Sequence, residues 1–600
     1  MEEEEGIRDN KNNKNITKDG SVDCYGKPAL KETSGTWRCG ILLLVNQGLV
    51  ILGFSGVEVN LVVFSKSVLR YSHAEAAHTF TTWIGTVYLF SLIGAFLSDS
   101  YLGRYLTCLI FQVIYIIGLI ALSLSTHIFL LTPQGCGKIG EPCEAHKPFQ
   151  IALFYTSIYL IALGNGAAEA ALAAFGADQF DEEDPKERQS KASFFTYFYL
   201  ALNLGALAAE TILVYIEDMG QWVLAFRICT LSSIVAYGFL LSGNLRYRRF
   251  KPCGNPISRF SQVIVASFRK FNLKMPLNGD QELYEVDLKE SERNGMRRIL
   301  HSNGFKFLDR AAIIMTEDMK LITTTTEGKS TQNPWHVCTV TQVEEVKCVL
   351  RLLPIWLCTI FSSVVFVQML SLFIEQGAVM NRRVFSFDIP PASMTVFDFI
   401  FTSLFIILYE RLVFPLHVKV TKREPKLPSA LERIGIGLAI ASLAMLVAGF
   451  VEQQRRKFAI GSLEQETSSL SILWQIPQYF LVGASDAFVY VARMEFFASQ
   501  APDGLKSLGI GLSLSASAMG SYGASAILSI VMRITSSSDG KKPGWVPPNL
   551  NDGHLDWFYF LSAALAALNF GLFVVCAKHY KPISFEKRDR ETEMRVLDST

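Results

Sequence analysis

Long apolar stretches separated by short polar turns run through most of the chain. About twelve of them reach the length of roughly 20 residues that a helix needs to cross a bilayer, and they begin near residues 40, 78, 104, 149, 192, 221, 345, 390, 431, 470, 506 and 556. Helices satisfy their own backbone groups in lipid, whereas a β-barrel would need shorter, alternating segments. The pattern therefore predicts an all-α membrane protein with twelve transmembrane helices.

A long polar stretch divides the spans into two sets of six. The predicted segments are a cytoplasmic N-terminal tail (1–39), a six-helix bundle (40–245), a cytoplasmic linker (246–341), a second six-helix bundle (342–580) and a cytoplasmic tail (581–600). Basic residues gather in the linker and after the last span, and cytoplasmic loops carry the excess of Lys and Arg. Two halves of this kind are typical of secondary transporters, whose substrates bind near the midplane between them.

Composition agrees with a multi-pass membrane protein, since the chain is 50% hydrophobic and 18% charged, with a net charge of +1. The sequence has no nucleophile and base pair, metal-ligand cluster or phosphate-binding loop. We therefore expect no enzymatic activity, no cofactor or bound metal and no nucleic-acid partner. Lipid is an expected partner, and the plasma membrane is favoured over the vacuolar membrane.

Several charged residues interrupt the apolar spans. Glu169 lies within the stretch 155–175, Glu58 lies in the first span, and Asp486 and Arg493 lie in the tenth. An ionised group near the bilayer centre costs several kcal/mol unless it is paired or faces water, so such residues usually mark a pathway. Asp486 and Arg493 are seven residues apart and share one helical face. Glu58 is either a proton-coupling acid or a carboxylate that faces an outer vestibule.

A second charged set consists of Glu210 in span five and Arg227 in span six. Each lies roughly eight residues from the midpoint of the short turn at 216–220. In an antiparallel hairpin they should reach similar depth. We expect a buried ion pair there, with a structural role favoured over a role in substrate binding.

The turn between spans two and three reads Asp99-Ser-Tyr-Leu-Gly-Arg104 and resembles the corresponding turn of the major facilitator superfamily. Gly103 permits the tight turn, and Asp99 and Arg104 can bond helix ends at the cytoplasmic face. We expect a gating turn. Thr107 follows Arg104 by three residues, a spacing that a regulatory kinase could recognise; the alternative is an ordinary threonine at a helix start.

Cys136 and Cys143 lie in the predicted outer loop between spans three and four. An oxidising compartment would permit a disulfide between them. The alternative is two free thiols.

Further motifs lie along most of the chain. They are Phe175 to Arg188, Phe194 to Gly205, Val343 to Trp356, Leu372 to Gly377, Ile389 to Met394, Met494 to Phe497 and Ala501 to Ser507. Together they resemble the plant nitrate and peptide transporter family, the proton-dependent oligopeptide transporters. Asn46 to Leu49 and Gly56 to Leu61 are similar to the branch linked to xylem nitrate transport. The resemblance implies the major facilitator fold and proton-driven transport of nitrate, peptides or plant hormones.

The chain departs from the family at the coupling positions. The first-span Glu-x-x-Glu-Arg motif aligns with the segment that begins at Gln47 and holds no protonatable group. The usual fourth-span Lys aligns with Glu169, its acidic partner with Asp486, and a usual Gln with Arg493. Two carboxylates that face each other are not readily ionised at the same time, because their negative charges repel. Arg493 therefore serves both acids, or the acids share a proton; a static salt bridge is the structural alternative.

Low-affinity, proton-linked nitrate transport is the first functional hypothesis. Phe366 replaces the histidine that some nitrate-transporting members carry, so Arg493 becomes the candidate for bidentate binding of the planar anion. The other candidate cavity residues are Tyr197, Asn203, Gln368 and Trp474. An acidic centre would suit potassium/proton exchange better. Transport of peptides or hormones, and a membrane sensor or scaffold without transport, are further alternatives.

Overall fold

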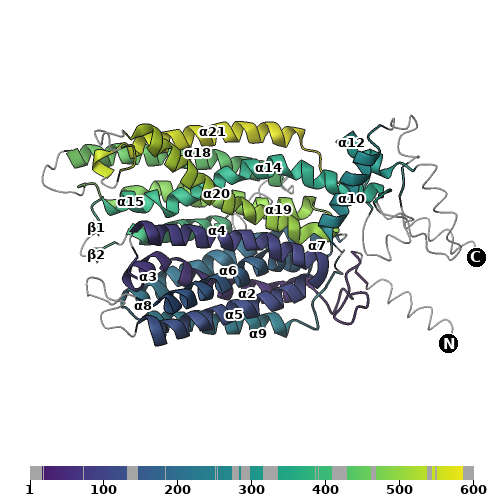
Figure 1. Ribbon diagram of the computed structural model, residues 1–600, viewed down its shortest axis with the longest axis horizontal. Coiled ribbons are helices and arrows are strands. Elements are labelled where there is room, and N and C mark those ends of the chain that lie inside the picture. The colour runs from purple at the N-terminus through teal and green to yellow at the C-terminus, as the bar shows by residue number, and fades with distance from the viewer. Residues whose placement is uncertain are drawn as a thin grey trace, which may run out of the picture.

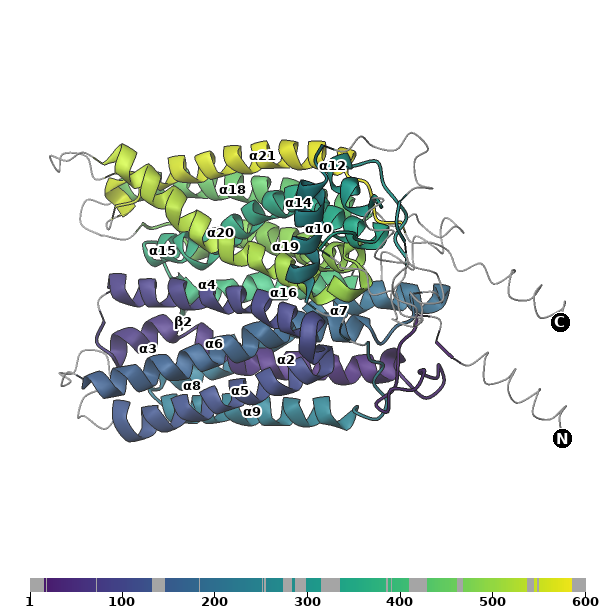
Figure 2. The same ribbon diagram turned by 45° about the vertical axis from the view of Figure 1, so that its right-hand side comes forward.

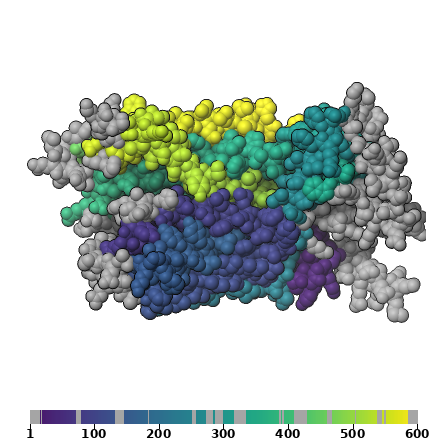
Figure 3. Space-filling model, viewed as in Figure 1, coloured from purple at the N-terminus to yellow at the C-terminus, as the bar shows by residue number. Residues whose placement is uncertain are grey.

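The computed structural model describes residues 16–17, 19–71, 73–131, 146–182, 184–250, 252, 255–272, 283–285, 298–314, 335–384, 387–389, 391–408, 429–460, 468–536, 544–547 and 550–584. Long helices, nearly parallel or antiparallel to one another, form two groups (Figure 1). The purple and blue helices belong to the first half of the chain, and the green and yellow helices belong to the second. The two halves meet along their length on the face shown in Figure 3.

The first half contains helices joined by short turns. They are α2 (Thr36–Glu58), α3 (Leu61–Ser67), α4 (His73–Leu97), α5 (Arg104–Ser125), α6 (Pro148–Ala177), α7 (Pro185–Ala208), α8 (Val214–Asp218) and α9 (Trp222–Ser242), with π-helical segments η1 (Ser98–Leu102), η2 (Thr126–Leu130) and η3 (Ala209–Leu213). Both α6 and α7 begin with proline. Proline has no backbone N–H, and the first residue of a helix does not need one because it has no intrahelical acceptor. The side chain of Asp184 caps α7 by accepting a hydrogen bond from the backbone N–H of Lys186.

The linker and the second half follow. Their elements are α10 (Pro256–Arg269), α12 (Lys306–Asp309), η5 (Arg310–Ala312), α14 (Val340–Leu370), α15 (Leu372–Ala378), β1 (Arg383–Val384), β2 (Phe387–Asp388), η6 (Pro391–Met394), α16 (Thr395–Leu408), α18 (Ala430–Ile460), η8 (Ile472–Gln475), α19 (Ile476–Gln500), η9 (Asp503–Leu505), α20 (Lys506–Thr535), η10 (Leu550–Asp552) and α21 (Leu555–His579). The two short strands are antiparallel, with Arg383 opposite Asp388.

The predicted all-α membrane fold is confirmed. Within the described residues, ten helices are long and apolar enough to cross a membrane. The other two predicted spans correspond to α16, of which 14 residues are described, and to α19, which carries Asp486, Arg493 and Glu495. Each of the twelve predicted spans therefore has a helix in the described part of the chain.

Small residues allow the helices to approach closely. A Cβ on Gly164 of α6 would lie 2.4 Å from the backbone nitrogen of Tyr115 in α5, closer than atoms tolerate. Across the boundary between the halves, a Cβ on Gly511 of α20 would lie 2.8 Å from the Cβ of Ala95 in α4. Small residues at helix contacts are the usual means of close packing in membranes. These glycines therefore let α6 pack closely on α5, and α20 of the second half pack closely on α4 of the first half.

The two ends of the molecule differ. Helices α10 and α12 of the linker lie at one end, and the strand pair lies at the other, as the two views in Figures 1 and 2 agree. Val263 and Ala266 of α10 share a small core with Leu308 of α12 and Val343 of α14. The linker therefore packs on the first turns of α14. We refer to this end, which is the predicted cytoplasmic one, as the linker end.

Candidate functional site

Five carboxylates converge at the boundary between the two halves. Glu58 of α2, Glu169 of α6 and Glu210 of η3 come from the first half, and Asp398 of α16 and Asp486 of α19 come from the second. The charge of Glu58 interacts with those of Glu169 and Glu210, and the charge of Asp398 interacts with those of Glu210 and Asp486. We call these five residues the acidic cluster.

Glu169 is held from the opposite half by a tyrosine. The hydroxyl of Tyr490 in α19 donates a hydrogen bond to Oε1 of Glu169 over 3.2 Å. The Tyr490 ring also stacks on Tyr199 of α7, with 4.3 Å between ring centroids. Tyr490 lies four residues after Asp486 and three before Arg493, so all three share one face of α19. The predicted approach of Glu169 to this face is observed, although the direct contact is Tyr490.

Arg493 is buried, with 2% of its surface exposed. Its guanidinium donates to the hydroxyl oxygens of Ser363 in α14, at 3.3 Å, and of Ser517 in α20, at 3.2 Å. Its charge interacts with Glu169 and Asp486, yet neither is among the ion pairs of the described residues. A direct bridge from Arg493 to both acids is therefore not formed. Among the described residues, the Nε–H of Arg493 has no hydrogen-bond partner.

The predicted ion pair between Glu210 and Arg227 is wrong. Oε2 of Glu210 accepts a hydrogen bond of 3.2 Å from the hydroxyl of Thr395 in α16, across the boundary between the halves. Arg227 is exposed on the outer surface of α9. The number of residues between a side chain and the turn predicts its depth along the helix, but it does not predict the direction in which the side chain points around the helix axis. Glu210 lies in a π-helical segment, which changes the helical phase, and its side chain points away from α9.

Asp398 is a member of the acidic cluster that the sequence analysis missed. It is 1% exposed, and its Oδ1 atom has no hydrogen-bond partner in the part of the chain that the structure describes. It packs against Gly483 of α19, where an added Cβ would lie 2.8 Å from Oδ1. The available signal was a single carboxylate in the apolar run Thr395-Val-Phe-Asp-Phe-Ile-Phe401, which is the same signal that identified Glu169.

Three other candidate cavity residues are buried polar groups. Gln47 of α2 is 1% exposed and its Nε2 has no partner. Asn203 of α7 donates to the backbone oxygen of Tyr199 at 2.8 Å, while its Oδ1 has no partner. Gln368 of α14 is 2% exposed. A role for these groups in substrate binding stays a prediction.

The remaining candidates lie in different surroundings. Trp474 is 53% exposed in η8, and its role in lining the cavity stays a prediction. Tyr197 packs edge to face against Trp37, with 5.5 Å between centroids, near the start of α2. Phe366 packs against the apolar core of the second half.

The turn between α4 and α5 joins the two halves at the linker end. Gly103 has φ +77°, which favours glycine. The Nε–H of Arg104 lies 3.4 Å from Oδ1 of Asp99 and 3.0 Å from the hydroxyl oxygen of Ser507 in α20. Arg104 also forms an ion pair with Asp178. Its contact with Ser507 joins the turn to α20 of the other half, and the gating role of this turn stays a prediction.

Further contacts close the same end. Oδ2 of Asp99 accepts a hydrogen bond of 2.8 Å from the backbone N–H of Leu508 in α20. Lys506 of α20 lies 3.4 Å from Oε2 of Glu182, in the segment between α6 and α7. Nearby, a hydrogen bond from Lys31 holds the pKa of Asp184 below its usual range. The two halves are thus joined through charged groups at the linker end.

Thr107 is fully buried, and its hydroxyl donates to the backbone oxygen of Gly103 at 2.9 Å. A kinase cannot reach a side chain in this position, so the structure contradicts the accessible phosphorylation site. Cys136 and Cys143 lie outside the described residues, and the disulfide stays a prediction.

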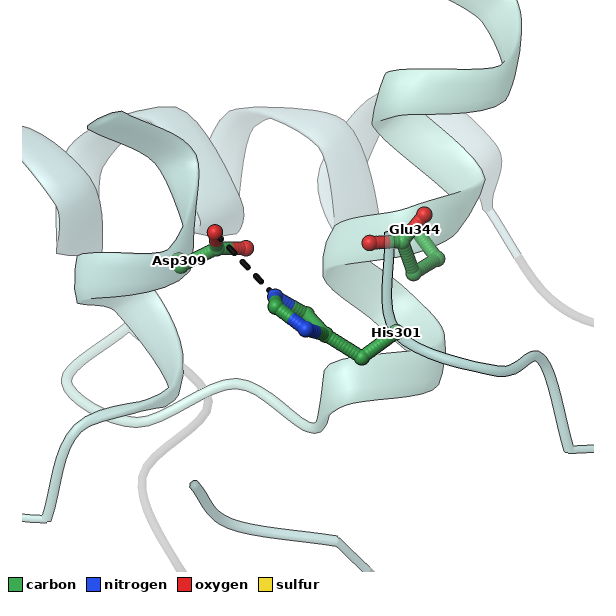
Figure 4. A group of neighbouring side chains, drawn as sticks. All are labelled: His301, Asp309 and Glu344. Carbon is green, nitrogen blue, oxygen red and sulfur yellow. Dashed lines mark ion pairs between the residues drawn. The ribbon is translucent and has the colours of Figure 1, made fainter. Parts of the chain in front are cut away.

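A second group of polar side chains ties the linker to α14. His301, Asp309 and Glu344 lie close enough to suggest a metal site (Figure 4). However, the ammonium of Lys347 lies 2.6 Å from Asp309 and 2.7 Å from Glu344, and it takes the place a cation would occupy. Arg351 adds a second positive charge, 2.9 Å from Glu344. The donor set suits an ion-pair network and does not fit a divalent metal.

Two groups of long apolar helices, with a buried charged centre between them and a charged closure at one end, define a membrane transporter of the major facilitator fold. The POT family model matches residues 105–546. The chain belongs to the POT family, in its plant nitrate and peptide transporter group, and it is not an enzyme.

Similar proteins from Arabidopsis thaliana include NRT1/PTR FAMILY 7.3, which is 52% identical over 582 residues, covering 96% of this chain and 94% of that protein. NRT1/PTR FAMILY 7.2 is 50% identical over 574 residues, covering 95% of this chain and 96% of that protein. Among solved structures, the POT family transporter PepTSo is similar with a TM-score of 0.58 and 22% identity, covering 91% of this chain and 99% of that one. This structural likeness supports the fold.

Proposed function

We propose that this transporter exchanges a monovalent cation for protons, with potassium as the first cation to test. The observation that carries the proposal is the net negative charge of the carboxylates at the central site. Five carboxylates interact there, and Arg493 is the one cation acting on Glu169 and Asp486 among the described residues. A nitrate ion would meet this excess of negative charge, whereas a cation that leaves water would be stabilised by it.

The same excess of carboxylates supports a link to protons. Neighbouring acids in a low-dielectric site cannot all be ionised, so some of them hold protons when no other cation is present. A bound cation favours ionisation of these acids and releases protons. Binding of the cation and binding of protons therefore oppose each other within the acidic cluster, and this opposition produces exchange when the cluster opens to each side of the membrane in turn.

Nitrate is the second candidate, and Arg493 is the observation that favours it. Its planar guanidinium has an Nε–H without a partner, and a fork of donors matches a planar oxyanion. Tyr490 lies beside it, with the guanidinium 5.7 Å from the ring centroid. In this arrangement the carboxylates would have to be protonated before the anion could bind.

Transport by the purified protein in proteoliposomes separates these candidates. Vesicles that contain a pH-sensitive dye are given inward gradients of potassium, nitrate or a dipeptide at two external pH values. We expect potassium to drive proton efflux, and Asp486→Asn to reduce the rate at least tenfold. Proton movement that depends on nitrate and is lost in Arg493→Gln would overturn the cation proposal. Silence with all three solutes, from protein that is inserted normally, would favour a sensor or scaffold.

A further inference from the structure

The acidic cluster contains two parts with different surroundings. Glu169 and Asp486 interact electrostatically with the positive charge of Arg493. The charges that act on Glu210 and Asp398, by contrast, are those of other carboxylates. In the described part of the chain, Glu210 and Asp398 therefore form a pair without a compensating cation.

The position of this pair follows from its contacts. Thr395 bonds to Glu210, and Asp398 lies three residues after Thr395, on the same face of α16. Asp398 Oδ1 also packs on Gly483 of α19. Asp398 is therefore enclosed between Glu210 of the first half and α19 of the second.

A tyrosine supplies an independent sign of a ligand at this place. Tyr479 lies four residues before Gly483, on the face of α19 that meets Asp398. It is 0% exposed, its hydroxyl has no hydrogen-bond partner among the described residues, and the charges that act on it are those of Asp398 and Glu210. A buried hydroxyl without a partner is costly. The Tyr479 hydroxyl therefore lies near the pair, and Oδ1 of Asp398, within the pair, also lacks a partner among the described residues.

We propose that Glu210 and Asp398 share one transported proton, at a subsite separate from the cation site around Glu169, Asp486 and Arg493. The idea rests on the proposed function in one respect, that the cargo moves with protons. Two neighbouring carboxylates in a low-dielectric site without a cation are not readily ionised together, because their charges repel, and one shared proton removes the repulsion. The hydroxyls of Thr395 and Tyr479 can donate to the carboxylate oxygens that remain.

The geometry also couples this proton to conformational change. Glu210 belongs to the first half and Asp398 to the second, so separation of the halves pulls the two carboxylates apart. The carboxyl group that holds the proton then faces water and ionises, and the proton leaves as hydronium. When the halves close again over two charged carboxylates, a proton must return. Glu58 and Asp486 face the pair from α2 and α19, and their negative charges favour the same uptake.

The test compares proton coupling with cargo exchange in the same vesicles. Asp398→Asn and Glu210→Gln should each reduce proton movement driven by the cargo at least tenfold. Exchange of labelled for unlabelled cargo at equal pH should fall much less than proton movement does in the same variant, because that reaction needs no net proton transfer. Glu217→Gln is the matched control, since Glu217 is a buried carboxylate of the first half that bonds to Asn60, and it should leave coupling unchanged.

The melting temperature of the detergent-solubilised Asp398→Asn protein should equal or exceed that of the wild type, because the change removes a buried acid. Glu210→Asp combined with Asp398→Glu retains two carboxylates and should recover part of the coupling. If nitrate or a dipeptide proves to be the cargo, the cation proposal fails. The shared-proton subsite is then tested by the same comparison, with that cargo in place of potassium. Full coupling in Asp398→Asn would overturn the shared-proton subsite.

Discussion

A carboxylate inside a membrane helix needs a donor, and Tyr490 supplies one to Glu169 from the opposite half. Because the bond crosses the boundary between the halves, it stabilises the conformation in which they are closed at the centre. Arg493, by contrast, bonds to Ser363 and Ser517 within its own half. The tyrosine, rather than the arginine, is the direct link between the halves at Glu169.

Tyr490→Phe removes this link and keeps the ring that stacks on Tyr199. A net hydrogen bond contributes about 0.5–1.5 kcal/mol, so the closed conformation should lose about two- to tenfold in population. We expect the apparent KM for cargo to rise by a similar factor. Tyr155→Phe is the control, since it removes a hydroxyl that bonds to Thr79 within the first half. An unchanged KM in Tyr490→Phe, with normal insertion, would contradict this role.

The sequence predicted the residues of the site better than their contacts. Glu169, Asp486 and Arg493 were identified because a charge in an apolar run is conspicuous, and they do lie together. The hydrogen-bond partners of these charged residues depend on how each helix is rotated about its axis, which the sequence does not show. Tyr490 and Tyr479 could not be singled out, because a tyrosine in an apolar span resembles an ordinary packing residue.

At the scale of elements, the linker is attached to α14 by a compact charged network. Lys347 is fully buried between Asp309 of α12 and Glu344 of its own helix. The hydroxyl and backbone N–H of Ser302 also bond to Glu344, at 2.7 and 3.0 Å. A long polar linker could be recognised from composition, but this attachment joins residues more than 30 positions apart and had no signal in the sequence.

Lys347→Met should destabilise the linker attachment, because two buried carboxylates would lose their common cation. Removal of one partner from a buried ion pair costs about 3–5 kcal/mol. We expect a lower melting temperature and faster proteolysis between α10 and α14. Lys306→Met, which removes an exposed lysine of α12, should change neither. A metal chelator should leave the wild type unchanged; a fall in melting temperature on chelation would indicate a bound metal instead.

For the whole molecule, the contacts at the centre and at the linker end stabilise the same conformation. Glu169 with Tyr490, and Glu210 with Thr395, join the halves at the centre. Arg104 with Ser507 joins them at the linker end. The division into two halves was evident from the spacing of the spans. Which end is closed could not be predicted, because the same sequence must form both the closed and the open contacts during transport.

Arg104→Ala should shift the molecule toward a conformation that is open at the linker end. Arg104 contacts Asp99, Asp178 and Ser507 at once, and its loss leaves two buried carboxylates without their cation, at a cost of about 3–5 kcal/mol. Spin labels at Leu245→Cys and Ser499→Cys, in a cysteine-free background, report the separation of the halves, since both positions are exposed near that end.

The double electron–electron resonance distances should lengthen in Arg104→Ala and stay as in the wild type in Arg227→Ala, which removes an exposed arginine of the same half. Tyr490→Phe weakens a contact of the same closed conformation, so its effect should add to that of Arg104→Ala in free energy, as expected for distant sites that act on one equilibrium. An unaltered distance distribution in Arg104→Ala would show that other contacts, such as Lys506 with Glu182, are sufficient to hold this end closed.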